Sequence, residues 1–514
     1  MKFSIMAATL VIAVSAFAQD QSMPTMDMSQ PSHQDQKPAD DMNMQHRQGS
    51  HTDTPVTQTP VNSSITHSTL TLQEPETPMN RTGNNLPAPE LLKDVVSRPA
   101  RSLAEFLGMA DQANPTIAQA NALVQRSAAQ ARQAGLYPNP IVGYQGEQIR
   151  GGSYGGGEHG SFVQQTIVLG GKLGLRRNIY EQQKQSDRIG VEEQTLRVHN
   201  DVTQAFYSAL TAQALVDVRR SLLGITLDAV QTVHQLANVG QADAPDILQS
   251  EVEAEQAKVD YVTAQRRFLQ SFRTLAAVAG QQDMLASPLQ GDLEHPPQID
   301  AEQQVTNIIA NSPEVRRAKQ EVAVAEARLK AARREPIPDL QLRAGEQYNG
   351  ELVRQNPNLP AGAQSFATAG INIPLWNRNQ GNKDAATVEM DRARQGVVRT
   401  QLYLQHEGAP LAQSYESARF EAERYKTELI PRAKRAYELY LAKYQNMAQA
   451  YPQVLVSQRT LFQLQVGYLT ALRETWTNAI ALQNFTLTGG LSEPQSSSTS
   501  STSLNLPNAG GGIE

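Results

Sequence analysis

An internal repeat is the feature that most constrains the fold of this chain. The stretch NPTIAQANALVQRSAAQARQAGLYPNP, starting at Asn114, aligns without a gap with SPEVRRAKQEVAVAEARLKAARREPIP, starting at Ser312. Further along, FVQQTIVLGG from Phe162 matches FATAGINIPL from Phe366. Because the matching segments keep the same order, two copies of one unit of about 200 residues are the simplest explanation. The predicted repeats span residues 98–290 and 291–490.

Each repeat has the same predicted order of elements. A helix comes first, and Asn114-Pro115 or Ser312-Pro313 interrupts it with a capping side chain followed by proline, a favourable helix start. Two strands with alternating polarity follow, and then two long helical segments. The predicted helices are 102–135, 172–238 and 244–280 in the first repeat and 301–334, 378–446 and 452–487 in the second, and the predicted strands are 139–150, 160–170, 338–349 and 364–375.

The predicted strands each have one apolar face, and the two repeats keep it. Leu340, Leu342 and Ala344 share one face, and Val142 and Tyr144 take the places of the two leucines in the first repeat. Four strands of about ten residues match a membrane-spanning β-barrel in length, but four strands cannot close one. Closure therefore requires several chains. Three copies would supply twelve strands, and two or four copies are also compatible with this reasoning.

The long helical segments predict a wall rather than a solid core. No proline occurs between Lys172 and Pro245, and residues 172–238 would extend about 100 Å as one helix. These segments are rich in Ala, Gln, Arg and Glu, so each buries only a narrow stripe, as in a coiled-coil wall or a hollow tube. Gly224 aligns with Pro431, which predicts that both long helices bend at an equivalent place.

Both ends of the chain differ in composition from the repeats. Residues 1–18 have an early lysine, a short apolar run and an Ala-Phe-Ala ending, which predicts a cleaved secretory signal rather than an anchor helix. Residues 19–97 contain no aromatic residue, and residues 491–514 are rich in serine, so both are predicted to be disordered. The sequence therefore predicts an exported protein.

Composition excludes several classes of function. The formal net charge is −6, which provides no basic surface for nucleic acid. The absence of cysteine excludes disulfides, thiolate metal sites and a lipid-modified amino terminus. His199, His234 and His406 are isolated on helical patterns, and no nucleophile–base set, phosphate loop or zinc-protease motif is present. We therefore predict that the chain is not an enzyme and needs no cofactor.

The predicted amino-terminal tail is unusually rich in methionine and histidine. Thioethers favour Cu(I), and imidazole accepts copper, zinc and other metals. We expect loose, multivalent binding of Cu(I) or Ag(I), although a linker of biased composition would explain the same residues. The candidate ligands are Met23, Met26, Met28, His33, Met42, Met44, His46 and His51.

The turns between the long helices contain a second set of candidate residues. Asp243 and Asp246 lie at the first turn, where carboxylates start a helix and favour its dipole. The alternative is an acidic ring at a tunnel mouth, since several copies of the chain would bring these carboxylates together. The candidate residues for such an entrance are Gly240, Asp243, Asp246, Ala448, Tyr451 and Pro452. Contact of these turns with a partner protein is what the family resemblance below implies.

Several of these motifs together resemble a known family. LYPNP at 136–140, TIVLGGKLGLRR at 166–177, INIPLWNRNQG at 371–381 and the turn from Gly240 to Glu251 are similar to the TolC-type outer-membrane efflux factors. The LGGK motif and the Met/His tail resemble the heavy-metal branch with the CzcC and CusC proteins.

The resemblance implies an α+β, TolC-like protomer that is internally duplicated. Its long antiparallel helical hairpins would form a periplasmic tunnel, and its four strands would contribute to a trimeric, twelve-stranded barrel in the outer membrane. The expected partners are two further copies of the chain, a periplasmic adaptor protein, a proton-driven inner-membrane pump and outer-membrane lipid.

The resemblance also implies a function and leaves alternatives. The expected function is a passive conduit for export of metal cations, copper and silver first. The same conduit could instead export drugs or other organic solutes. A soluble periplasmic metal-binding or coiled-coil adaptor protein, with the strands in a soluble domain, is an alternative from another class.

Overall fold

The computed structural model describes residues 89–149, 157–353, 359–445 and 451–494. The chain divides into two units, residues 1–83 and 84–514, and every described residue belongs to the second. Within the described ranges, no helix is both long enough and apolar enough to cross a membrane.

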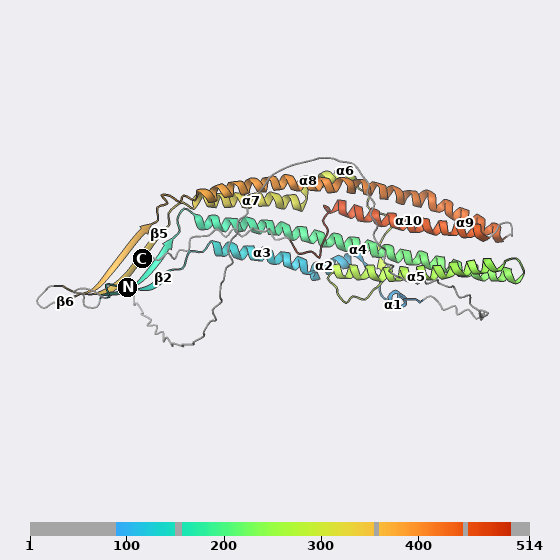
Figure 1. Ribbon diagram of the computed structural model, residues 1–514, viewed down its shortest axis with the longest axis horizontal. Coiled ribbons are helices and arrows are strands. Elements are labelled where there is room, and N and C mark those ends of the chain that lie inside the picture. The colour runs from blue at the N-terminus through green and yellow to red at the C-terminus, as the bar shows by residue number, and fades with distance from the viewer. Residues whose placement is uncertain (1–88, 150–156, 354–358, 446–450, 495–514) are drawn as a thin grey trace, which may run out of the picture. The chain divides into compact units, whose positions relative to one another are not determined.

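The elements of the second unit follow the repeat. α1 Lys93–Val96 precedes the first repeat. The elements of the first repeat are β1 Arg101–Ser102, α2 Leu103–Ala113, α3 Pro115–Ala134, β2 Ile141–Glu147, β3 Glu158–Ile167, α4 Lys172–Asn238, α5 Ala244–Val278 and β4 Leu289–Gln290. Those of the second repeat are α6 Ala301–Asn311, α7 Pro313–Arg334, β5 Leu340–Val353, β6 Leu359–Ile371, α8 Gln380–Arg424, a π-helical turn Tyr425–Leu429, α9 Ile430–Gln445 and α10 Tyr451–Gln483. The strands β2, β3, β5 and β6 lie at one end of the long helices, and the α4–α5 turn, the end of α9 and the start of α10 lie at the other (Figure 1).

The breaks in the first helix of each repeat have the predicted chemistry. The Asn114 side chain caps α3 by accepting a hydrogen bond from the Thr116 N–H at 2.9 Å, and Pro115 follows at the first helical position. Ser312 caps α7 in the same way, accepting from the Val315 N–H at 3.2 Å. Proline at this position has no N–H to leave unsatisfied, so each pair ends one helix and starts the next.

The four main strands form one antiparallel sheet in the order β2-β3-β5-β6. The central pair joins the two repeats, with Phe162 opposite Gly345. The register places Val142, Val163, Ala344 and Ala367 in one row across the sheet. The apolar face predicted from the sequence is therefore confirmed, and Val142 on it is 73% exposed.

The hairpin between β5 and β6 extends further than predicted. β5 ends at Val353 and β6 starts at Leu359, whereas the predicted strands left a long loop from 350 to 363. The polar and Pro-rich sequence there suggested a loop, but backbone pairing continues past a bulge at Asn349/Leu352 because an exposed hairpin needs no apolar side chains. β6 ends at Ile371, short of the predicted 375, before Pro374, which cannot donate to a ladder.

The two long helices differ. α4 is one helix of 67 residues through Gly224. The predicted helix 378–446 is instead interrupted, because a five-residue π-helical turn separates α8 from α9. Pro431 has no N–H for the usual bond to the fourth preceding carbonyl, and the Ile430 N–H donates to the Tyr425 carbonyl, the fifth preceding one.

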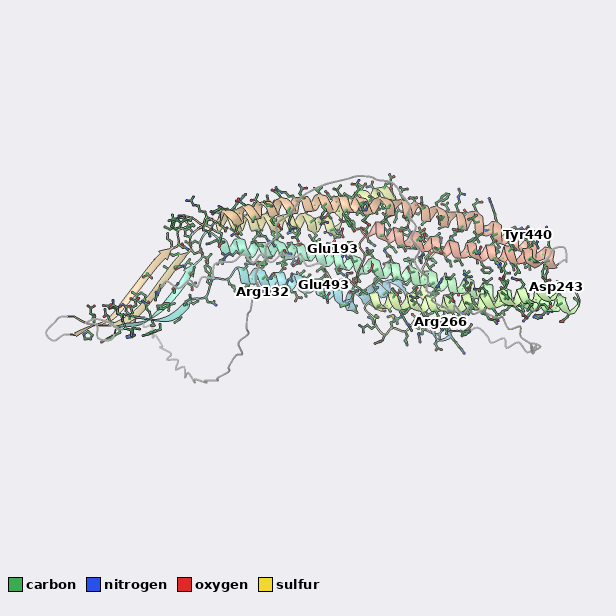
Figure 2. The ribbon with its side chains drawn as sticks, viewed as in Figure 1. Arg132, Glu193, Asp243, Arg266, Tyr440 and Glu493 are labelled. Atoms are coloured by element: carbon green, nitrogen blue, oxygen red, sulfur yellow. The ribbon has the colours of Figure 1, made fainter. Side chains whose placement is uncertain are left out.

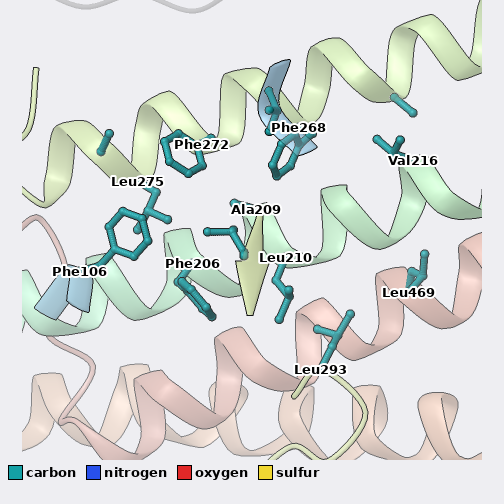
Figure 3. Packing of buried hydrophobic residues seen from close by; sticks show 14 of the residues in the cluster. Phe106, Phe206, Ala209, Leu210, Val216, Phe268, Phe272, Leu275, Leu293 and Leu469 are labelled. Atoms are coloured by element: carbon teal, nitrogen blue, oxygen red, sulfur yellow. The ribbon is translucent and has the colours of Figure 1, made fainter. Parts of the chain in front are cut away.

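The largest apolar core lies where α2, α4, α5 and α10 meet. Phe106, Phe206, Phe268 and Phe272 are nearly inaccessible, and the Phe106 ring stands edge-on to Phe272 with centroids 6.0 Å apart (Figure 3). Leu469 of the second repeat belongs to the same cluster. This core therefore fixes one helical hairpin against the other.

Both predicted tails contain ordered residues at their inner ends. The range 19–97 includes α1, whose Val95 is buried in the main core beside Leu92. Of the range 491–514, Pro494 is buried. The disorder predicted for these residues is therefore wrong, because a few apolar side chains find a core made by distant helices. Residues 1–88, which include the predicted signal, and residues 495–514 lie outside the described residues.

Candidate functional site

The turn between α4 and α5 is built by two local motifs. Gly240 has φ +74°, a left-handed conformation that favours glycine. The Gln241 N–H donates to the Leu236 carbonyl at 2.8 Å and the Gly240 N–H to the Ala237 carbonyl at 3.0 Å, which completes a Schellman motif that ends α4. Asp243 then caps α5, accepting from the Asp246 N–H at 3.4 Å. The chain therefore reverses direction at this turn (Figure 2).

The two predicted carboxylates lie together at this turn. Asp243 is exposed, and Asp246 is half-buried. Partial burial and the neighbouring Asp243 carboxylate raise the pKa of Asp246 above its usual range. In a single chain, Asp243 therefore caps α5, and Asp246 carries the carboxyl group whose pKa is raised.

The second turn, between α9 and α10, is described only in part. Ala448 lies outside the described residues, Tyr451 is the first residue of α10, and Pro452 is exposed. Tyr444 of α9 lies close enough to α5 that burial and then the Asp246 charge raise the pKa of its phenol. Ile247 beside Asp246 packs in the same apolar cluster as Tyr444, so the acidic turn of the first hairpin lies beside the end of α9.

The two hairpins pack together near their turns through a small apolar cluster. Val233 of α4 and Val454 and Leu455 of α10 are buried there. Ala229, Ala242, Ile247, Tyr437, Leu441 and Tyr444 pack around them.

Polar side chains near the turns add two links that the sequence reasoning missed. Arg459 of α10 pairs with Glu253 of α5, with Arg459 Nε donating to Glu253 Oε2 at 3.3 Å. His234 Nε2 of α4 lies 3.2 Å from Glu251 Oε1 of α5. Arg459 and Glu253 are far apart in the sequence and do not align between the repeats, so no sequence signal could have paired them.

The joint between the sheet and the helices has special backbone geometry in both repeats. Gly171 precedes α4 with φ +69°, and Asn379 precedes α8 with φ +59°. The buried Lys172 ammonium pairs with Asp339 at 2.7 Å and donates to the Ile337 carbonyl at 2.9 Å, which fastens α4 to the start of β5.

A buried charged cluster holds α4 against α7, and no motif predicted it. Glu193 pairs with Arg197 at 2.6 Å and with Arg317 of α7 at 3.3 Å. Burial, and then the Glu193 charge, raise the pKa of Glu314, which lies 3.4 Å from Arg197. Since these charges are paired within the chain, we assign them to helix packing.

The isolated histidines are not brought together. His199 pairs with Asp111 at 2.6 Å, and His406 is exposed. In the part of the chain that the structure describes, no group of three or more His, Asp or Glu side chains could hold a metal ion. The candidate metal ligands Met23, Met26, Met28, His33, Met42, Met44, His46 and His51 lie outside the described residues.

Comparison with known protein families identifies the family of this chain. The outer membrane efflux protein family matches residues 106–281 and 305–489, one match for each repeat. The chain belongs to this family. Membership confirms the predicted resemblance and the prediction that the chain is a channel component and not an enzyme. It contradicts the alternative of a soluble periplasmic adaptor.

The relatives include proteins named for metals and for organic solutes. The chain is 24% identical to the cobalt-zinc-cadmium resistance protein CzcC of Cupriavidus metallidurans over 62% of its length and 74% of the relative. It is 24% identical to the cation efflux system protein CusC of Escherichia coli K12 over 62% of its length and 70% of the relative. The toluene efflux pump outer membrane protein TtgC of Pseudomonas putida is 26% identical over 34% of this chain and 36% of the relative.

Solved structures show the same fold. A CusC crystal structure superposes with a TM-score of 0.61 at 19% identity and covers 75% of this chain and 92% of CusC. The outer membrane protein VceC of Vibrio cholerae gives a TM-score of 0.61 at 17% identity and covers 76% of this chain and 97% of VceC. The α+β, TolC-like fold expected from the sequence is therefore confirmed.

Proposed function

We propose that this protein is the outer-membrane channel of a three-part efflux system and that it passes metal cations, copper and silver first. The observation that carries the proposal is a four-stranded sheet joined end-on to two long helical hairpins. A sheet with an exposed apolar face suits lipid, and long hairpins with narrow apolar stripes suit the wall of an aqueous conduit.

The open edges of the sheet support a homotrimer. Within the described strands, β2 and β6 each pair on one side only. In lipid an unpaired edge leaves backbone groups without hydrogen bonds, so β2 of one copy would pair with β6 of the next. Three copies would bring together twelve strands.

The hairpin turns support two further partners. The α4–α5 turn, which contains Asp243, and the start of α10 lie at the end of the helices farthest from the sheet, where a periplasmic adaptor would bind (Figure 2). A proton-driven inner-membrane pump would then supply the energy, as the similarity to components of efflux pumps and cation efflux systems suggests. We further propose that residues 1–18 direct export and that, without a cysteine to carry lipid, the sheet alone anchors the protein.

The extent of the matches supports metal cations as cargo. The match to CzcC covers 74% of that protein and the match to CusC covers 70%, against 36% for TtgC. The tail adds the preference for soft ions, because thioethers bind Cu(I) and Ag(I) well. We propose weak binding there and no required cofactor. The similarity to TtgC keeps organic solutes as the second candidate cargo.

Tolerance assays in a strain that lacks the gene for this protein test the proposal. Complementation with the full chain should restore tolerance to copper and silver salts, while tolerance to toluene stays unchanged. Restored toluene tolerance alone would favour the second candidate. Recovery of the protein in the soluble periplasmic fraction, instead of as a trimer in the outer membrane, would overturn the channel proposal.

A deletion of residues 19–97 that keeps residues 1–18 separates the role of the tail from that of the channel. Loss of copper and silver tolerance with the trimer still present in the outer membrane would support metal collection by the tail. Unchanged tolerance would show that the tail is a linker.

A further inference from the structure

The sheet face opposite the apolar one carries an arginine held between two aromatic rings. The Arg343 guanidinium of β5 lies 3.9 Å from the centre of the Phe162 ring on β3 and 5.7 Å from that of Phe366 on β6. The register places Arg343 and these rings on one face, two residues apart along their strands. Cations are attracted to ring faces, so this arrangement fixes the position of the charge.

Glycines make room for both rings. A side chain at Gly143 would collide with the Phe162 ring at 2.5 Å, and one at Gly345 would meet the Phe366 ring at 2.9 Å. Each phenylalanine therefore leans over the glycine of a neighbouring strand. The row Gly143, Phe162, Gly345, Phe366 forms a continuous base across the sheet, on which Arg343 lies.

The positive charge of Arg343 has no carboxylate partner among the described residues. Its guanidinium donates to the side-chain carbonyl of Gln145, a neutral group, and its Nε is buried without a hydrogen-bond acceptor in that part of the chain. Guanidinium groups stay protonated in proteins, so the charge is permanent.

Two carboxylates lie on the same face, toward the hairpin loops. Glu158 accepts from Gln347 and Asn349, each at 2.8 Å. Glu147 accepts from Gln145, the same side chain that accepts from Arg343, so one glutamine separates the Glu147 carboxylate from the guanidinium. Arg343 therefore opposes the negative potential that these carboxylates create at this face of the sheet.

We propose that Arg343 is a selectivity-determining residue that lowers the cation preference of the strand section of the conduit. This inference rests on the proposed trimer, in which the polar face lines the lumen and three copies of Arg343 surround the path. Glu147 and Glu158 on the same face, and the acidic turns at Asp243 and Asp246 at the opposite end, favour cations. Arg343 therefore limits a cation preference that the carboxylates of the sheet and of the turns create.

Ion selectivity of the full-length protein in planar lipid bilayers tests the proposal. Under a potassium chloride gradient, Arg343→Gln should shift the reversal potential toward cations, with an increase in the potassium-to-chloride permeability ratio of about twofold or more. Arg343→Lys should keep most of the wild-type selectivity, because it keeps the charge. Glu346→Gln, on the opposite face, should leave selectivity unchanged.

The cysteine-free sequence provides a second measurement within one folded variant. In Arg343→Cys, a positively charged methanethiosulfonate should restore the wild-type reversal potential, and a negatively charged one should shift it further toward cations. Conducting Arg343→Gln and modified Arg343→Cys channels with unchanged reversal potentials would overturn the proposal. A wild-type protein that forms no channel would overturn the proposed function instead.

Discussion

The two long helices, although related by the repeat, are built differently. α4 is uninterrupted, and 17 of its 67 residues are buried, which anchors it between α3, α5, α7 and α10. α8 buries six of 45 residues, and the π-helical turn after it buries none. The two repeats therefore keep the same order of elements, but α4 is more deeply buried against its neighbouring helices than α8 is. We expect substitutions in the long helix of the first repeat to reduce stability more than substitutions in that of the second repeat.

The largest expected change in stability comes from removing one aromatic ring from each long helix. Phe206→Ala in α4 should destabilise the protein by about 3–5 kcal/mol, because the ring is buried in the main core. Phe420→Ala in α8 is the control, since that ring is 58% exposed. Denaturant unfolding of the detergent-purified protein, followed by circular dichroism, measures both. Equal losses would show that α8 is anchored as firmly as α4.

A pair of glycine substitutions compares the change in stability at the end of α4 with the change in its middle. Gly240→Ala should cost about 1 kcal/mol, because the left-handed conformation of the Schellman turn strains any side chain. Gly224→Ala should stabilise by about 0.5–1 kcal/mol, since no atom lies within 4 Å of an added methyl and alanine favours a helix. The same unfolding assay reports both, and two changes of the same sign would contradict the geometry of the turn.

Replacing Pro431 tests whether this residue causes the interruption in the second repeat. Pro431→Ala restores an N–H that can donate to the fourth preceding carbonyl, so residues 425–429 can become α-helical. We expect slower amide exchange across Tyr425–Leu429 and a stability gain of about 1 kcal/mol or less. Unchanged exchange would assign the π-helical turn to packing instead. Pro410→Ala, within uninterrupted α8, is the matched control.

The smallest expected effect concerns pH at the acidic turn. Folding raises the pKa of Asp246, so its carboxylate destabilises the folded protein once the pH exceeds the raised value. Asp246→Asn should therefore be slightly more stable than the wild type at neutral pH. The difference should vanish as the pH falls below the ordinary aspartate range, where the wild-type group is protonated in both states. A gain that persists there would assign the effect to something other than charge.

Much of the fold, but less of the site, could be predicted from the sequence. The helix breaks at Asn114 and Ser312 and the shared apolar face of Val142 and Val163 follow from capping chemistry and period-two alternation, which are local. The alternation places Arg343 on the polar face of its strand, but nothing local shows that Phe162 of the other repeat lies beneath it. The acidic turn at Asp243 was recognised because proline and a capping residue mark it.

The sequence by itself determined the duplication, the helical and strand periods and the polarity of each face, because these depend on neighbours a few residues apart. Only the tertiary structure decided that β3 pairs with β5 across the repeats, that Arg459 meets Glu253 and that Pro431 follows a π-helical turn while Pro410 lies within a regular helix. These features depend on which distant surfaces come into contact. A local pattern specifies what a segment buries, but not which segment covers it.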